Sequence, residues 1–196
     1  CAQTVAQWVG GSGSWSDTNH WDIGKVPSNA GATTYIAVID IPSDNPVVSV
    51  TSAVTVSGLV NSETVRVETG GALNLSGGLT NRGSLTAAAG MLRLTGASAD
   101  NVGALISAEG ATAVITNSTI SGGVLQVSDN TTSVIRFGGN VTMTGVTWDD
   151  PGQGEFQIYN AVTRLLGDYE HLLPSGYTLV VNSQSTHAAV QWLMGS

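Results

Sequence analysis

Residues 71–77 read GALNLSG, and residues 90–96 repeat that pattern as GMLRLTG at an offset of nineteen. An overlapping frame has a period of twenty, in which TNRGSL at residues 80–85 is followed by DNVGAL at residues 100–105. Self-similarity at a short fixed period indicates a repeat architecture, whose units pack mainly against their neighbours. The repeat therefore decides the fold class before any local propensity is considered.

The unit of this repeat has an internal period of two. Leu73 and Leu75 flank Asn74, and residues 65–67 and 92–94 alternate in the same way. Such alternation places one side of a strand in a core and the other in water. A single short coil cannot bury its apolar side, but stacked coils share a continuous core. The sequence therefore predicts an all-β fold, a single-stranded parallel β-helix (β-solenoid) with coils of about twenty residues.

Three sets of residues are expected to recur from coil to coil. The alternation predicts these inward-facing pairs: Val48/Val50, Val54/Val56, Val65/Val67, Leu73/Leu75, Leu92/Leu94, Leu125/Val127 and Val141/Met143. The frame of twenty also relates four apolar residues: Val65, Leu85, Leu105 and Leu125. Asparagines at the corners are expected to stack as polar ladders that bond to the next coil: Asn74, Asn81, Asn101 and Asn117.

The chain is predicted to be one solenoid domain, residues 1–196, with three parts. Residues 1–46 are rich in tryptophan and are interpreted as an N-terminal cap, residues 47–147 are the regular coils, and residues 148–196 are aromatic-rich C-terminal coils. The segments VAQWV at residues 5–9 and AVQWL at residues 189–193 are weakly alike. This likeness is either chance or a sign that both ends supply equivalent strands to a head-to-tail joint.

The N-terminal segment carries a family resemblance. Residues 8–21 read WVGGSGSWSDTNHW, and a Val-Pro pair and a strand-like segment follow them. This order resembles the start of bacterial autotransporter-like and adhesin-type parallel β-helix surface proteins. His20 separates Asn19 from Trp21, where the usual pattern has an adjacent Asn-Trp pair. The resemblance covers most of the chain through motifs of coil geometry, and it implies a right-handed solenoid on a bacterial surface.

Composition excludes several classes of partner. Charged residues are only 10% of the chain, and the net charge of −8 reflects scarce Lys and Arg, which argues against nucleic acid and anionic membrane surfaces. No stretch of eighteen apolar residues is present, so no membrane span is expected. No signal peptide is seen, which suggests a mature or trimmed form. The single cysteine, Cys1, excludes an internal disulfide and is a candidate for lipidation or an intermolecular thiol.

Few residues have the spacing that catalysis requires. A glycosidase needs two carboxylates about 5–9 Å apart, and Asp149 and Asp150 are the best local candidates. Adjacent strand residues point to opposite sides, so residues 149–152 (DDPG) are better interpreted as a turn. We therefore expect no enzymatic activity.

Other polar and aromatic residues have structural interpretations as well. Asp40, Asp44 and Asn45 could touch calcium, but a solvated loop is preferred, because the Asp-rich repeat of calcium solenoids is absent. The three histidines are scattered, so no metal or other cofactor is expected. Trp15 and Trp21 are either sugar-stacking platforms or, as preferred, a plug for the open end of the solenoid. Three arginines between apolar neighbours form either an outward basic stripe or, as preferred, separate solvated charges: Arg66, Arg93 and Arg136.

These observations favour a structural role. The expected function is that of a secreted extracellular subunit of a self-assembling, head-to-tail surface filament or adhesin stalk, as in a biofilm matrix. The expected partner is a second copy of the chain, with cell-surface or matrix glycans as a further partner. The joint is expected near four tryptophans: Trp8, Trp15, Trp21 and Trp192. The alternative is a carbohydrate-binding, less plausibly a carbohydrate-cleaving, β-helix module.

Overall fold

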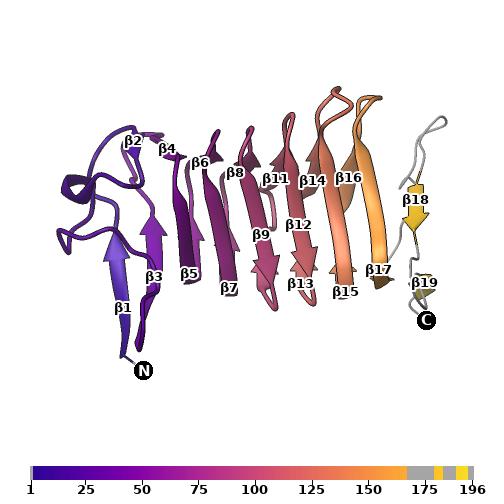
Figure 1. The fold of residues 1–196 in the computed structure, drawn as a ribbon, viewed down its shortest axis with the longest axis horizontal. Coiled ribbons are helices and arrows are strands. Elements are labelled where there is room, and N and C mark those ends of the chain that lie inside the picture. The colour runs from indigo at the N-terminus through magenta and orange to yellow at the C-terminus, as the bar shows by residue number, and fades with distance from the viewer. Residues whose placement is uncertain (1, 167–178, 183–188, 194–196) are drawn as a thin grey trace.

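The computed structural model describes residues 2–166, 179–182 and 189–193. They form an all-β parallel solenoid of about six turns, which confirms the predicted fold class. Figure 1 shows the strands stacked along the long axis, from β1 (Ala2–Gln7) at one end to β18 (Leu179–Asn182) and β19 (Ala189–Leu193) at the other. All pairings between these strands are parallel.

The strands belong to a 12-stranded and a 7-stranded sheet. The elements between the two ends are β2 (Gly13–Ser14), the 3-10 turn η1 (Thr18–His20), β3 (Thr33–Ile39), β4 (Val47–Val50), β5 (Ala53–Asn61), β6 (Thr64–Val67), β7 (Ala72–Asn81), β8 (Ser84–Ala87), β9 (Met91–Thr95), β10 (Ser98–Asp100), β11 (Leu105–Ala108), β12 (Thr112–Thr116), β13 (Thr119–Ser121), β14 (Val124–Val127), β15 (Val134–Thr144), β16 (Thr147–Asp149) and β17 (Glu155–Leu166).

The two sheets make three faces, because the longest strands contribute to two faces each. Register shifts between Val56 and Gly58 and between Gly138 and Gly139 mark the corner within these strands. Face A contains the first halves of β5, β7, β15 and β17 with β9, β12 and β18. Face B contains β1, β3, β10, β13, β19 and the second halves of the long strands. Face C is the 7-stranded sheet of β2, β4, β6, β8, β11, β14 and β16.

Apolar columns run through the interior, as the period of two predicts. Paired residues along face A form a buried column: Val54, Leu73, Leu92, Ala113, Ile135 and Phe156. Every inward pair that the sequence predicts is buried. Neighbouring strands of a sheet lie about 4.8 Å apart, so each apolar side chain contacts its equivalents above and below, and the core is continuous along the axis.

The spacing of twenty between apolar residues does not hold in the core at Leu105. Leu85 pairs with Ile106, and Ile106 pairs with Leu125, whereas Leu105 lies opposite Ser84 and is half-buried. The corner after Asn101 holds one residue more than the equivalent corner after Asn81. Because side chains alternate along a strand, a shift of one residue exchanges the inner and outer positions.

A ladder of buried asparagines runs through one corner. The Nδ2 of Asn61 donates to Oδ1 of Asn81, and the Nδ2 of Asn81 donates to Oδ1 of Asn101, both at 2.8 Å. All three side chains are fully buried. Asn74 and Asn117 were predicted in the ladder but lie elsewhere: Asn74 donates to the carbonyl of Val54, and Asn117 accepts from the amide of Asn140. Among the described residues, the asparagines that recur at a spacing of twenty bond to one another through their side chains, whereas the side chain of Asn117 bonds the backbone of Asn140.

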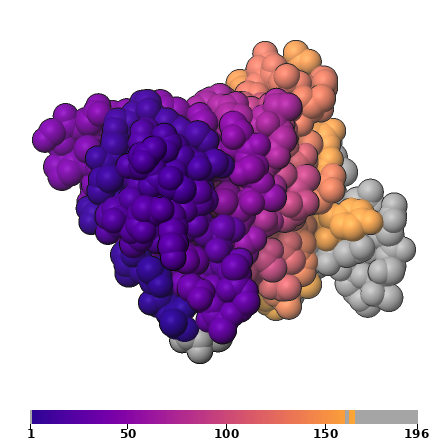
Figure 2. All heavy atoms as spheres, turned by 60° about the vertical axis from the view of Figure 1, so that its left-hand side comes forward, coloured from indigo at the N-terminus to yellow at the C-terminus, as the bar shows by residue number. Residues whose placement is uncertain are grey.

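The tryptophans of the N-terminal segment fill the wide first turn. Trp8, Trp15 and Trp21 are at most 2% exposed, and Trp21 contacts the other two edge-to-face at centroid distances of 5.1 and 4.9 Å. Each indole N–H has an internal acceptor, the carbonyls of Gly11, Pro27 and Trp15. Figure 2 shows this end closed by a continuous surface of indigo and violet atoms. The burial supports the plug and excludes these rings as exposed platforms for sugars.

Aromatic side chains enter the core again near the other end. Phe137, Trp148 and Phe156 stack inside the solenoid, with interplanar angles of 26° or less and centroids 4.7 to 6.4 Å apart. They occupy columns that hold aliphatic residues in earlier turns. Of the predicted C-terminal coils at residues 148–196, β17 ends at Leu166, and residues 167–178, 183–188 and 194–196 lie outside the described residues.

Candidate functional site

The paired carboxylates lie in a turn. Asp149 is the last residue of β16, and its Oδ2 accepts from the Nε2 of Gln126 at 2.6 Å. Asp150 is buried, and its Oδ1 accepts from the amide of Gly152 at 2.9 Å. This carboxylate therefore closes a local turn. The local turn begins at Asp150, one residue later than the sequence predicts, because Asp149 still belongs to the strand.

Histidines and acidic residues form no metal-binding group of three or more in the described part of the chain. His20 packs edge-on against Trp8 at a centroid distance of 4.6 Å. It also lies over Gly13, where a Cβ would stand 2.2 Å from the imidazole ring. In the predicted solvent loop, the carboxylate of Asp44 accepts from the amide of Asn45. His171 and His187 lie outside the described residues.

The expected assembly residues occupy different environments. Trp8, Trp15 and Trp21 are buried inside the chain. Their rings cannot contact another copy directly, so they can affect a joint only by supporting the first turn, to which β1 belongs. Trp192 lies in β19 opposite Leu165, and only its backbone is described. Cys1 lies outside the described residues.

The three arginines do not form one stripe. Arg66 lies on face C and bonds Glu68 at 3.2 Å and Glu109 at 2.9 Å. Arg93 and Arg136 lie on face A, separated in their column by Val114. Arg93 donates to Asn74 and Arg136 donates to Gln157. Each arginine thus links its own turn to another, which is a structural role.

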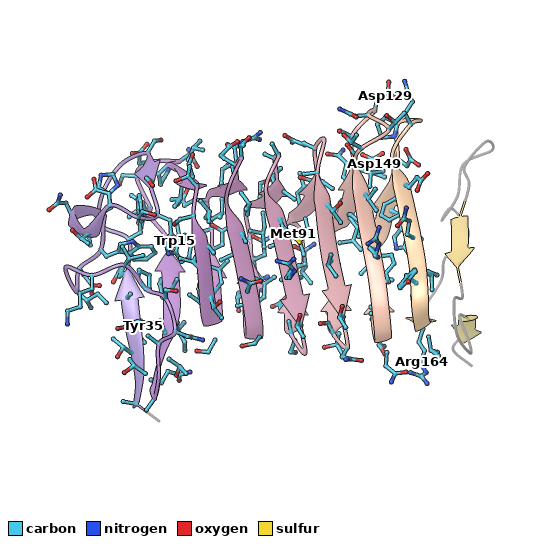
Figure 3. The ribbon with its side chains drawn as sticks, viewed as in Figure 1. Trp15, Tyr35, Met91, Asp129, Asp149 and Arg164 are labelled. Carbon is cyan, nitrogen blue, oxygen red and sulfur yellow. The ribbon has the colours of Figure 1, made fainter. Side chains whose placement is uncertain are left out.

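Arg82 and Asp100 form an exposed ion pair between successive turns of face B. The guanidinium donates to the carboxylate of Asp100 and to the backbone carbonyls of Asn81 and Asp100. The hydrogen bond from Arg82 lowers the pKa of Asp100, with a smaller contribution from the amide of Val102. Other charges are spread out: Asp129 lies on a projecting loop and Arg164 at the opposite edge (Figure 3).

We expect Asp100→Asn to lower the urea midpoint at neutral pH and to leave it unchanged in strong acid. The folded pKa of Asp100 lies below the ordinary value of 3.8. Its stabilisation is therefore fully present above that value and is lost as the pH falls through the folded pKa. Urea titrations of both chains across this range measure the difference, with Asp129→Asn as the control for loss of an acidic charge. A difference that persists in strong acid would contradict the ion pair as its cause.

A shallow trough of about 460 Å³ lies on face C. Gly83 and Gly123 are among the residues that line it. Both positions require glycine, because a Cβ at either one would stand 2.0 Å from a backbone oxygen of the preceding turn. The displaced Leu105 adds an apolar patch, and the bonded pair of Gln126 and Asp149 adds polar atoms. The trough lies along the corner beside the asparagine ladder, and it offers both apolar and hydrogen-bonding contacts.

The strongest candidate for a functional surface is the backbone edge of β1. β1 pairs only with β3 among the described strands, and its sequence, AQTVAQ, has neither charge nor proline. Val5 at its centre is 56% exposed. Unpaired edges without charge or proline are templates for another strand. Sequence reasoning placed the joint at the tryptophans and offered residues 5–9, which include Val5, as a possible joint strand, but it missed Gln3, although the uncharged strand was a visible signal.

No protein-family model, curated protein or solved structure matches this chain. The described residues contain no helix with the length and apolar character that a bilayer crossing requires.

Proposed function

We propose that this chain is a structural extracellular protein of a bacterial surface, a unit that assembles head-to-tail into a filament or adhesin stalk. One observation carries the proposal: face B is a continuous line of parallel strands from β1 to β19, at opposite ends of the solenoid (Figure 1). A copy displaced along the axis has the same strand direction, so the sheet of face B can continue across the joint. A head-to-tail contact that does not close on itself produces a filament.

Side chains of the solenoid suit a mechanical role. Cross-turn bonds tie neighbouring turns at several points, including the asparagine ladder and the bonds from Arg66 and Arg82. The low share of Lys and Arg makes nucleic acid an unsuitable partner. The partner proposed for the joint is a second copy of the chain, and glycans of the cell surface or matrix are proposed as further ligands.

We expect the purified chain to form thin filaments as its concentration rises from sub-micromolar to high micromolar. The nine described strands along face B, from β1 to β19, lie about 4.8 Å apart and predict an axial repeat of about 43 Å along each filament. Negative-stain electron microscopy and sedimentation velocity on the same samples measure the repeat and the association. A single monomeric species at every concentration would contradict self-assembly.

The trough on face C favours a second function, carbohydrate binding, because Gln126 and Asp149 lie beside the apolar Leu105. Discrete rods that bind glycans as monomers in the same experiment would favour this function over the filament.

A further inference from the structure

The N-terminal end of the solenoid covers most of its own backbone edge. On face C, the carbonyl of Ser14 in β2 accepts from the amide of Asp17 at 2.9 Å. On face B, the amide of Gln7 donates to Oδ1 of Asp22 at 2.8 Å, and its carbonyl accepts from the amide of Asp22 at 2.9 Å. The amide of Val9 donates to the carbonyl of His20. These bonds substitute for a neighbouring strand from Gln7 onward.

The first half of β1 has no such cover. The amide of Trp8 bonds to Val38 in β3, and backbone groups of a strand point alternately to its two sides. The even-numbered residues of β1 therefore face β3, and the odd-numbered residues face away from it. Gln7 is held by Asp22, which leaves the N–H and C=O groups of Gln3 and Val5 directed outward. β1 pairs with no other strand in the described part of the chain.

This open segment exposes an apolar side chain and contains neither a charged residue nor a proline. Val5 and Val9 are each 56% exposed, which makes them two of the most exposed large apolar side chains among the described residues. Exposed edges of soluble proteins are usually protected by a charge or a proline. Asp22 protects the edge at Gln7 by bonding its backbone, whereas neither a charge nor a proline of β1 protects Val5.

A second copy of the chain is the partner whose geometry already fits. The face B column that begins at Ala6 continues through successive parallel pairings to Trp192 in β19. The first and last strands of face B therefore run in the same direction and share one register. Continuing that register across a joint places Ala6 of one copy next to Trp192 of another, and Val5 next to Gln191. The sequence likeness of residues 5–9 to 189–193 aligns Trp8 with Trp192, whereas the register of the structure aligns Ala6 with Trp192, two positions earlier.

We propose that the outward edge of Gln3 and Val5 is the acceptor for β19 of a second copy, which pairs with it in parallel. This inference rests on the proposed head-to-tail assembly and names its joint. The bonds to Asp22 restrict the joint to the first half of β1, so the added strand pairs over only a few residues. The contact is confined to face B at this end, because β2 is two residues long and its Ser14 carbonyl is occupied.

The test replaces Val5 with proline and compares it with Val5→Thr. The amide of Val5 points away from β3, so proline removes an outward donor without removing a bond inside the chain, and prolines are tolerated at sheet edges for this reason. We expect Val5→Pro to raise the concentration for half-association about tenfold or more. Val5→Thr keeps the amide and a β-branched side chain, and we expect it to stay within about threefold of the parent. Circular dichroism and urea midpoints verify that both variants fold.

Hydrogen exchange of the parent chain gives a second readout. The amides of Gln3 and Val5 should become protected as the concentration rises, whereas the amide of Gln7, which Asp22 holds, should change little. Association of Val5→Pro equal to that of the parent would overturn the joint and leave end-to-end assembly standing. A parent chain that stays monomeric, with the same exchange at Val5 at every concentration, would overturn both.

Discussion

Replacing Asn81 with alanine is expected to lower the free energy of unfolding by about 4 kcal/mol, since each buried polar group that loses its partner costs about 1–3 kcal/mol. Asn81 is the central member of the ladder. Its Nδ2 donates to Oδ1 of Asn101 at 2.8 Å and to the carbonyl of Leu105 at 2.9 Å. The substitution deprives both acceptors of this donor and also removes an acceptor of Asn61. Equilibrium unfolding in urea measures the loss.

Asn74→Ala is the matched control for this prediction. Asn74 also donates to a carbonyl of the preceding turn, at 3.1 Å, but its side chain is only half-buried. Water can replace its bonds, so we expect a loss below about 1 kcal/mol. Equal losses in the two variants would mean that burial of the ladder does not determine its contribution.

Replacing Trp21 with alanine is expected to lower the free energy of unfolding by about 4 kcal/mol, within the range for removing a large aromatic residue from a core. Trp21 is the central ring of the N-terminal cluster and contacts both Trp8 and Trp15. Its indole N–H also donates to the carbonyl of Trp15 at 2.8 Å. The alanine variant leaves a cavity and removes the donor from that carbonyl. Unfolding in urea gives the magnitude.

The Trp21 and Asn81 variants should differ in which strands lose stability. A solenoid is stabilised by contacts between neighbouring turns, so loss of an end turn should not unfold the middle. We expect hydrogen exchange in Trp21→Ala to accelerate at β1, β3 and β4 and to remain slow at β9. Trp21→Phe, which keeps a ring but loses the N–H, should show a smaller acceleration in the same strands. Uniform acceleration along the chain would contradict this local response.

Repetition and alternation in the sequence determined the fold class and most of the core. The pairs Leu73/Leu75 and Leu92/Leu94 are predictable because the alternation of side chains is a local property of any strand. The predicted ladder members Asn81 and Asn101, which are twenty residues apart, do bond in the structure, whereas the third member, Asn61, was not predicted. These features need no knowledge of distant contacts, since each turn repeats the preceding one.

Tertiary structure alone decided the features that depend on how turns meet. A single extra residue in one corner exchanged Leu105 for Ile106 in the core, and the repeat by itself does not locate such an insertion. The open and covered parts of β1 depend on Asp22 reaching Gln7 across fifteen positions, a contact outside any periodic pattern. The sequence therefore determines the stacked coils, whereas non-periodic loops determine which edge remains available to a partner, because their bonds form only after the chain has folded back on itself.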